Sequence, residues 1–115
     1  MSSLVLDSYA LLAYFGKEAG WERVTDQLTR AANDEVNLFL SVVNWGEVDY
    51  ITRRLYDQDT ADEVLTAIDE LPIIVRDVDR SLARAAAQFK ARGGLSYADC
   101  FAVGLTRQVD GAVLT

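Results

Sequence analysis

Short apolar runs alternate along this chain with longer segments in which apolar residues recur every three or four positions. The runs have the length of strands and occupy residues 4–6, 36–40, 72–75 and 111–115. The segments between them carry the period of a helix, as in the stripe formed by Trp21, Val24 and Leu28. Alternating strands and helices are typical of a parallel sheet with helices packed on its faces. The pattern therefore predicts an α/β fold.

The predicted helices begin and end at residues that suit helix ends. Further helices are expected over residues 8–15, from 42 onward, and over 61–68, 82–89 and 98–109. Ser41 is a good amino-terminal cap for the helix that follows it, and Gly93-Gly94 ends the helix before it. Pro72 is tolerated as the first residue of a strand. We find no internal repeat or linker, so the chain is expected to form a single domain.

Three acidic residues stand at comparable places in this pattern. Asp7 ends the first strand, Glu47 lies in the first two turns of the helix after the second strand, and Asp99 lies near the start of the last helix. In a parallel α/β sheet these places meet at the carboxyl edge of the strands, where ligands bind. Three carboxylates in one crevice repel one another unless a cation holds them. The arrangement predicts a site for Mg²⁺ or Mn²⁺, which prefer oxygen ligands.

Each acid also has a purely structural interpretation. Asp7 or Ser8 can cap the first helix, and Ser96 and Asp99 have the spacing of a capping box. Glu47 can be a solvated helix carboxylate, although its apolar neighbours indicate that much of this helix is buried. The metal-site hypothesis therefore depends on the coincidence of all three acids at one sheet edge.

The amino-acid composition excludes several classes of catalytic site. The chain has no histidine, which excludes Ser-His and Cys-His catalysis and the usual zinc sites. Its single cysteine, Cys100, lies in an apolar helix and is expected to be a core residue. No segment has the length and apolarity of a membrane span, and the amino terminus lacks the basic region of a signal peptide. We therefore expect a cytoplasmic protein.

The net charge of −7 is unusual for a protein that binds nucleic acid. Residues 57–70 contain six acids and no base, and so account for most of this excess. The stretch is expected to be a solvated helix face or, alternatively, a partner surface. Basic residues elsewhere that are candidates to line a path for RNA are Arg53, Arg54, Arg80 and Arg84.

Four short motifs follow one another along the chain. They are Leu4-Val5-Leu6-Asp7-Ser8, Asn44-Trp45-Gly46-Glu47, Leu95-Ser96-Tyr97-Ala98-Asp99-Cys100 and Ala112-Val113-Leu114-Thr115. In this order they resemble the PIN-domain ribonucleases and, among these, the VapC-type toxins of prokaryotic toxin-antitoxin pairs. The resemblance covers the whole chain and implies a three-layer α/β/α PIN-like fold with a central, mainly parallel sheet of four or five strands.

The resemblance further implies a Mg²⁺- or Mn²⁺-dependent endoribonuclease, a hydrolase in which Asp7, Glu47 and Asp99 are the catalytic metal ligands. Ser8 and Asn44 match positions near this acidic site and rank second, as residues that orient water or ligands. The implied partners are an RNA substrate, a second copy of the chain and a cognate antitoxin. Such proteins commonly carry one more acid just after the last core strand. Since the sequence ends at Thr115, we expect residues 1–115 to be one PIN-like domain lacking its carboxyl-terminal segment.

Three other interpretations compete with the nuclease. A haloacid-dehalogenase-type phosphatase needs a second Asp two residues after the first, where this chain has Tyr9. A response-regulator receiver needs an acidic pair after the first strand and a lysine near the last strand, and both are missing. A non-catalytic PIN-like module would bind RNA or protein without cutting. Phosphatase activity would favour the first, and RNA binding without metal-dependent cleavage would favour the last.

Overall fold

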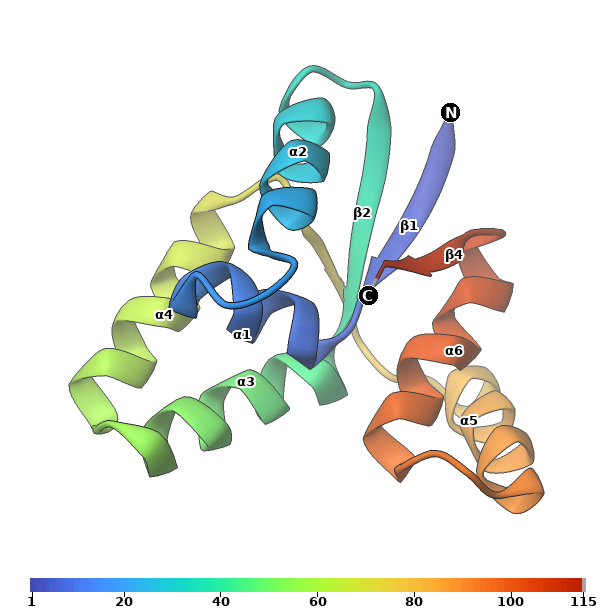
Figure 1. Cartoon of the computed structure of the whole chain (residues 1–115). Helices are drawn as coiled ribbons and strands as arrows, with labels where there is room; N and C mark the ends of the chain where they lie inside the picture. The colour runs from blue at the N-terminus through green and yellow to red at the C-terminus, as the bar shows by residue number, and fades with distance from the viewer. Residues whose placement is uncertain (115) are drawn as a thin grey trace.

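A sheet of four parallel strands forms the centre of the molecule (Figure 1). The structure is a computed structural model, and it describes residues 1–114. The strands are β1 (Ser2–Leu6), β2 (Val36–Ser41), β3 (Ile74–Arg76) and β4 (Ala112–Leu114), and they lie in the order β3-β2-β1-β4. The two central strands are buried on both faces, which explains why they read as continuous apolar runs rather than as alternating ones. The predicted α/β fold with a parallel sheet is confirmed.

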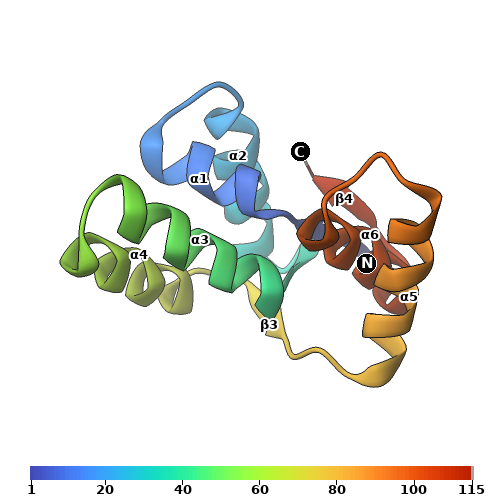
Figure 2. The ribbon, with the colours of Figure 1, turned by 90° about the horizontal axis from the view of Figure 1, so that it is seen from below.

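Helices cover both faces of this sheet, so the described residues form three layers (Figures 1 and 2). On one face lie α1 (Ser8–Gly16), α2 (Trp21–Ala32), α3 (Val42–Leu55) and α4 (Gln58–Glu70), and on the other lie α5 (Arg80–Arg92) and α6 (Tyr97–Val109). Successive strand side chains point to opposite faces, so Leu6 and Leu40 pack with the first group of helices while Val5 packs with the second. No helix in residues 1–114 combines the length and apolar character needed to cross a membrane.

Short polar side chains begin three of the helices at positions that the sequence predicts. Asp7 caps α1 by accepting a hydrogen bond from the backbone N–H of Ala10 at 2.8 Å. Ser41 caps α3 and Ser96 caps α6, where the Ser96 hydroxyl accepts from the Asp99 N–H at 3.2 Å. These caps satisfy N–H groups that have no partner inside the helix. They also fix the points at which the chain leaves the sheet edge.

The last two strands differ from their predicted bounds. The third strand begins at Ile74 rather than Pro72 and continues to Arg76. The residues before it turn instead, because the Ile73 N–H donates to the Leu71 carbonyl at 2.7 Å. In the fourth strand, Gly111 still belongs to the preceding turn, since its N–H donates to the Thr106 carbonyl. Thr115, the predicted end of that strand, lies outside the described residues.

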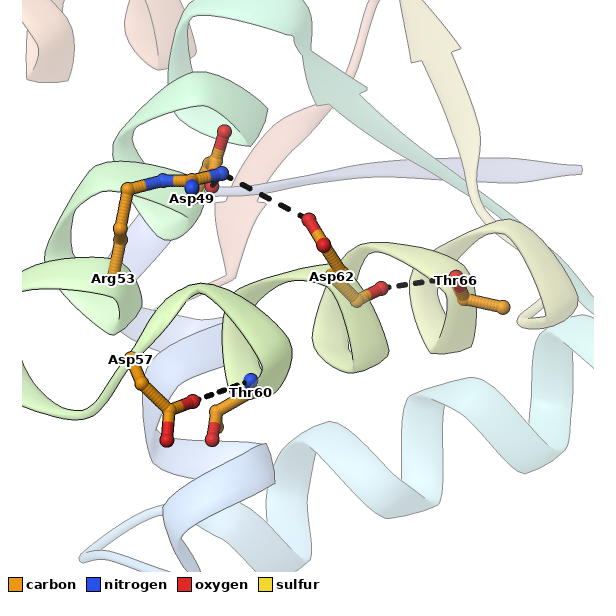
Figure 3. A network of polar contacts seen from close by, with 6 residues as sticks. All are labelled: Asp49, Arg53, Asp57, Thr60, Asp62 and Thr66. Carbon is orange, nitrogen blue, oxygen red and sulfur yellow. Dashed lines mark hydrogen bonds and ion pairs between the residues drawn. The ribbon is translucent and has the colours of Figure 1, made fainter.

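The acidic stretch forms α4, and all six of its acids are exposed to solvent, as predicted. Arg53 of α3 donates to Asp49 at 3.0 Å and lies 3.9 Å from Asp62 of α4 (Figure 3). Asp57 begins α4 by accepting from the Thr60 N–H at 2.7 Å (Figure 3). Arg53 is therefore already engaged with carboxylates, which weakens its candidacy as an RNA contact. Such exposed pairs contribute only about 0 to 1 kcal/mol to stability.

Gly111 lies tightly against the backbone of β1. A Cβ placed there would meet the Ser3 carbonyl oxygen, with the Ser3 carbonyl carbon only 2.9 Å away. We expect Gly111→Ala to push β4 away from β1 and to lower the free energy of unfolding by about 1 to 3 kcal/mol, the usual cost of overpacking. Urea denaturation followed by circular dichroism measures this change.

Gly46→Ala in α3 is the matched control for that substitution. Nothing lies within 4 Å of a Cβ at Gly46, so alanine gains helix propensity there at no steric cost. We expect the control to raise the free energy of unfolding by up to about 1 kcal/mol. Equal stability of Gly111→Ala and the unsubstituted protein would contradict the close approach of β4 to β1.

Candidate active site

The carboxyl edge of the sheet gathers the predicted site residues. β1 and β2 end at the same level, since Leu6 pairs with Leu40. Asp7 follows β1 directly, and α3, which carries Glu47, follows β2 without a loop. The carboxyl end of α6 leads into β4, so the first turn of α6, which carries Asp99, lies at the opposite end of that helix, toward the same edge (Figure 1).

Asp7 and Asp99 line one pocket of about 310 Å³. The other residues of its wall are aliphatic and come from the start of α6, from its second turn and from β4: Leu95, Ala102, Val103 and Val113. Sequence reasoning did not predict that these apolar residues line the site. Helical spacing was the available signal for two of them, because Ala102 and Val103 follow Asp99 by three and four residues and so share its helix face.

The Glu47 carboxylate is held by two hydrogen bonds to the same oxygen. The Ser8 hydroxyl donates to Glu47 Oε1 at 2.6 Å, and Asn44 Nδ2 donates to Glu47 Oε1 at 3.3 Å. Asn44 Nδ2 also donates to the Ala98 carbonyl in α6, at 3.2 Å. Ser8 and Asn44 are both buried. The two second-ranked residues therefore contact the central acid directly.

The pKa of Asp7 depends on the other two acids of the site. Burial raises the pKa of the Asp7 carboxyl above its usual value, and the charges of Asp99 and Glu47 raise it further. The hydrogen bond from the Ala10 N–H opposes these effects and lowers the pKa. Glu47 and Asp99 therefore both lie near enough to Asp7 for their charges to act on its carboxyl group.

The acids nevertheless do not form a closed cage. Within residues 1–114, no three acidic or cysteine side chains stand close enough together to surround a metal ion. Asp7 and Asp99 share the pocket, whereas Glu47 is held by Ser8 and Asn44. Carboxylates without a counter-ion repel one another, which is consistent with this separation.

Solved structures with a similar fold share most of the chain's length. VapC20 of Mycobacterium tuberculosis, described as a Sarcin-Ricin loop cleaving toxin, is 18% identical, with a TM-score of 0.70 over 95% of this chain and 86% of its own. VapBC2 of Rickettsia felis, bound to a DNA fragment from its promoter, is 9% identical, with a TM-score of 0.75 over 98% and 86%. A toxin-antitoxin complex from Klebsiella pneumoniae is 11% identical, with a TM-score of 0.64 over 97% and 84%. At these identities the likeness is one of fold.

Sequence comparison assigns the family. A search of curated proteins finds no match. A family model does match, that of the PIN domain, and it covers residues 4–115. Its span includes residues 4–6 of β1, all of β2, β3 and β4, and the three acids at the carboxyl edge. The chain therefore belongs to the PIN domain family.

Proposed function

We propose that this protein is a metal-dependent endoribonuclease toxin of the VapC type, which hydrolyses RNA phosphodiester bonds and is neutralised by a cognate antitoxin. The observation that carries the proposal is the placement of Asp7, Glu47 and Asp99 at the carboxyl edge of a PIN-domain sheet, where the charges of Asp99 and Glu47 help to raise the pKa of Asp7. RNA as the substrate implies that the protein acts in the cytoplasm. The toxins and toxin-antitoxin complexes of similar fold support the same proposal.

The residues present fit a hard divalent cation. All three candidate ligands supply oxygen, which Mg²⁺ and Mn²⁺ prefer over nitrogen or sulfur. The raised pKa of Asp7 shows that its negative charge is unfavourable in the folded protein, and a cation would offset that cost. When bound, such an ion polarises a phosphate and makes a water molecule a better nucleophile.

The side chains around the acids have separable tasks in this proposal. Asp7 and Asp99 would hold the ion in their shared pocket, and Ser8 and Asn44 keep the Glu47 carboxylate directed by hydrogen bonds. The aliphatic walls of the pocket offer no hydrogen-bonding side chain apart from the two carboxylates. We therefore expect shape and stacking, rather than base-edge contacts in this pocket, to set RNA preference.

A second, apolar pocket supports a protein partner. It has a volume of about 260 Å³ and lies between α1 and α3. Among the residues that line it, Tyr9, Leu55 and Tyr56 are exposed to solvent. Exposed aromatic and aliphatic side chains gathered at a concave surface are typical of interaction sites. The antitoxin, or a second copy of the chain in a homodimer, would cover them.

The first test is cleavage of RNA by the purified protein. We expect it to cut RNA in Mn²⁺ or Mg²⁺ and to be inactive in chelator, because the metal supplies the activated water. Asp7→Asn, Glu47→Gln and Asp99→Asn should each reduce the rate by about 100-fold or more, a loss typical for removal of a group that stabilises the transition state. Gel analysis of a structured pool, with transfer RNAs and ribosomal fragments that include the sarcin-ricin loop, measures cleavage.

The matched control is Asp59→Asn on the exposed face of α4, which should cut at the unsubstituted rate. Cleavage that survives in all three site variants would indicate a contaminating nuclease. Metal-independent RNA binding with no cleavage of any RNA would instead favour the non-catalytic module. Such an outcome would agree with the absence of a closed acidic cage within residues 1–114.

The second test concerns stability without metal. The pKa of Asp7 is raised above its ordinary value of 3.8 in the folded protein, so the folded state loses stability relative to the unfolded chain as pH rises from 3.8 through the raised pKa. Asparagine has the same shape and also caps helices. We therefore expect Asp7→Asn to melt at or above the unsubstituted protein at pH 7 in chelator, and to lose the rise in melting temperature that Mn²⁺ gives. Differential scanning fluorimetry measures both effects.

Asp57→Asn is the control, because its expected effect on the melting temperature has the opposite sign. Asp57 also caps a helix, but hydrogen bonds from the Thr60 hydroxyl and N–H lower its pKa. The charged form is therefore favoured in the folded state, and its removal should lower the melting temperature at pH 7 while leaving the Mn²⁺ response intact. If Asp7→Asn melts well below the unsubstituted protein in chelator, the charge of Asp7 is not a burden and the metal-site argument weakens.

A further inference from the structure

The Glu47 carboxylate accepts hydrogen bonds from two residues, and each of them connects it to a segment that carries another acid. Ser8, which donates to Glu47 Oε1, directly follows Asp7 in the chain. Asn44, which donates to the same oxygen, also donates to the carbonyl of Ala98, the residue before Asp99. Asn44 thus joins α3 to the first turn of α6. The three acids come from three separate segments, and these links connect their backbones.

The orientation of the Asn44 amide is settled by its neighbours. Both groups near Nδ2, the Glu47 carboxylate and the Ala98 carbonyl, only accept hydrogen bonds. A flipped amide would bring its oxygen against two other oxygens, so Nδ2 must face them. Both N–H groups of the amide are then used to tie Glu47 to α6.

The buried Asn44 amide lowers the stability of the folded protein. Asn44 is 0% exposed, and its Oδ1 atom is buried with no hydrogen-bond partner within residues 1–114. A buried polar atom without a partner opposes folding, and an apolar side chain of similar size would avoid the cost. Packing alone would therefore favour an apolar side chain at position 44. The two hydrogen bonds that the amide donates, to Glu47 and to the Ala98 carbonyl, explain why asparagine is there instead.

We propose that Asn44 is a positioning residue: by tying Glu47 to the first turn of α6, it fixes the place from which the Glu47 carboxylate acts together with Asp7 and Asp99 when a cation binds. This inference rests on the proposed metal-dependent function and deepens it. Ser8 completes the link on the Asp7 side. Hydrogen bonds that orient ligands usually change metal affinity by about 10- to 100-fold when they are removed.

Isothermal titration of Mn²⁺ into the purified protein tests the proposal directly. Asn44→Leu keeps a similar volume but has no donor, and we expect its Mn²⁺ dissociation constant to rise at least about ten-fold. Asn44→Thr has one hydroxyl donor for two acceptors and should show an intermediate rise, which also covers the case that the leucine variant does not fold. At saturating Mn²⁺ we expect RNA cleavage by the folded variants to recover toward the unsubstituted rate.

The control is Thr52→Val, which removes another buried polar group from the same helix, beside the pocket between α1 and α3. It should leave the Mn²⁺ dissociation constant unchanged. If the unsubstituted protein binds Mn²⁺ and the Asn44 variants bind it equally well, Asn44 has only a packing role and the inference is overturned while the proposed function stands. If the unsubstituted protein binds no Mn²⁺, the metal site and the positioning role fall together.

Discussion

Parallel pairing of β1 with β2 brings the carboxyl ends of both strands to the same level, with Leu6 opposite Leu40. Both strands are covered by helices on each face, so the parts that lie between the helix layers, residues 4–6 of β1 and 38–40 of β2, are apolar. Polar side chains gather where the chain leaves the sheet, with Ser41 at the last position of β2 and with Asp7 and Ser8 directly after β1. The position of the acidic site follows from this constraint.

Two polar groups at the carboxyl edge of the sheet lower the stability of the folded protein. The Asp7 carboxylate serves the fold as a helix cap through the Ala10 N–H, yet burial and the neighbouring acids make its charge unfavourable. The Asn44 amide similarly joins two helices while it leaves its own oxygen without a partner among the described residues. Costs of this kind at one edge are typical of a functional site.

The net charge of −7 would disfavour RNA binding, but the negative charge is concentrated on one part of the surface. The acids of α4 face solvent and partly pair with Arg53, so they form a surface of their own (Figure 3). Exposed basic side chains lie instead on the layer that carries Asp99, where Arg84 and Arg107 line one depression on α5 and α6. A polyanion that reaches the acidic pocket along this layer would avoid α4.

Sequence by itself determined the parallel α/β fold, the helix caps and the placement of Asp7, Glu47 and Asp99 at one edge, because these depend on local periodicity and on strand direction. It did not fix the start of β3, where the turn at Leu71 and the pairing with β2 decide the register. Nor did it show the bond from Asn44 to the Ala98 carbonyl or the aliphatic wall around Asp7 and Asp99. Those contacts join residues far apart in the chain, and only the packing of α3 and α6 on the sheet brings them within reach of each other.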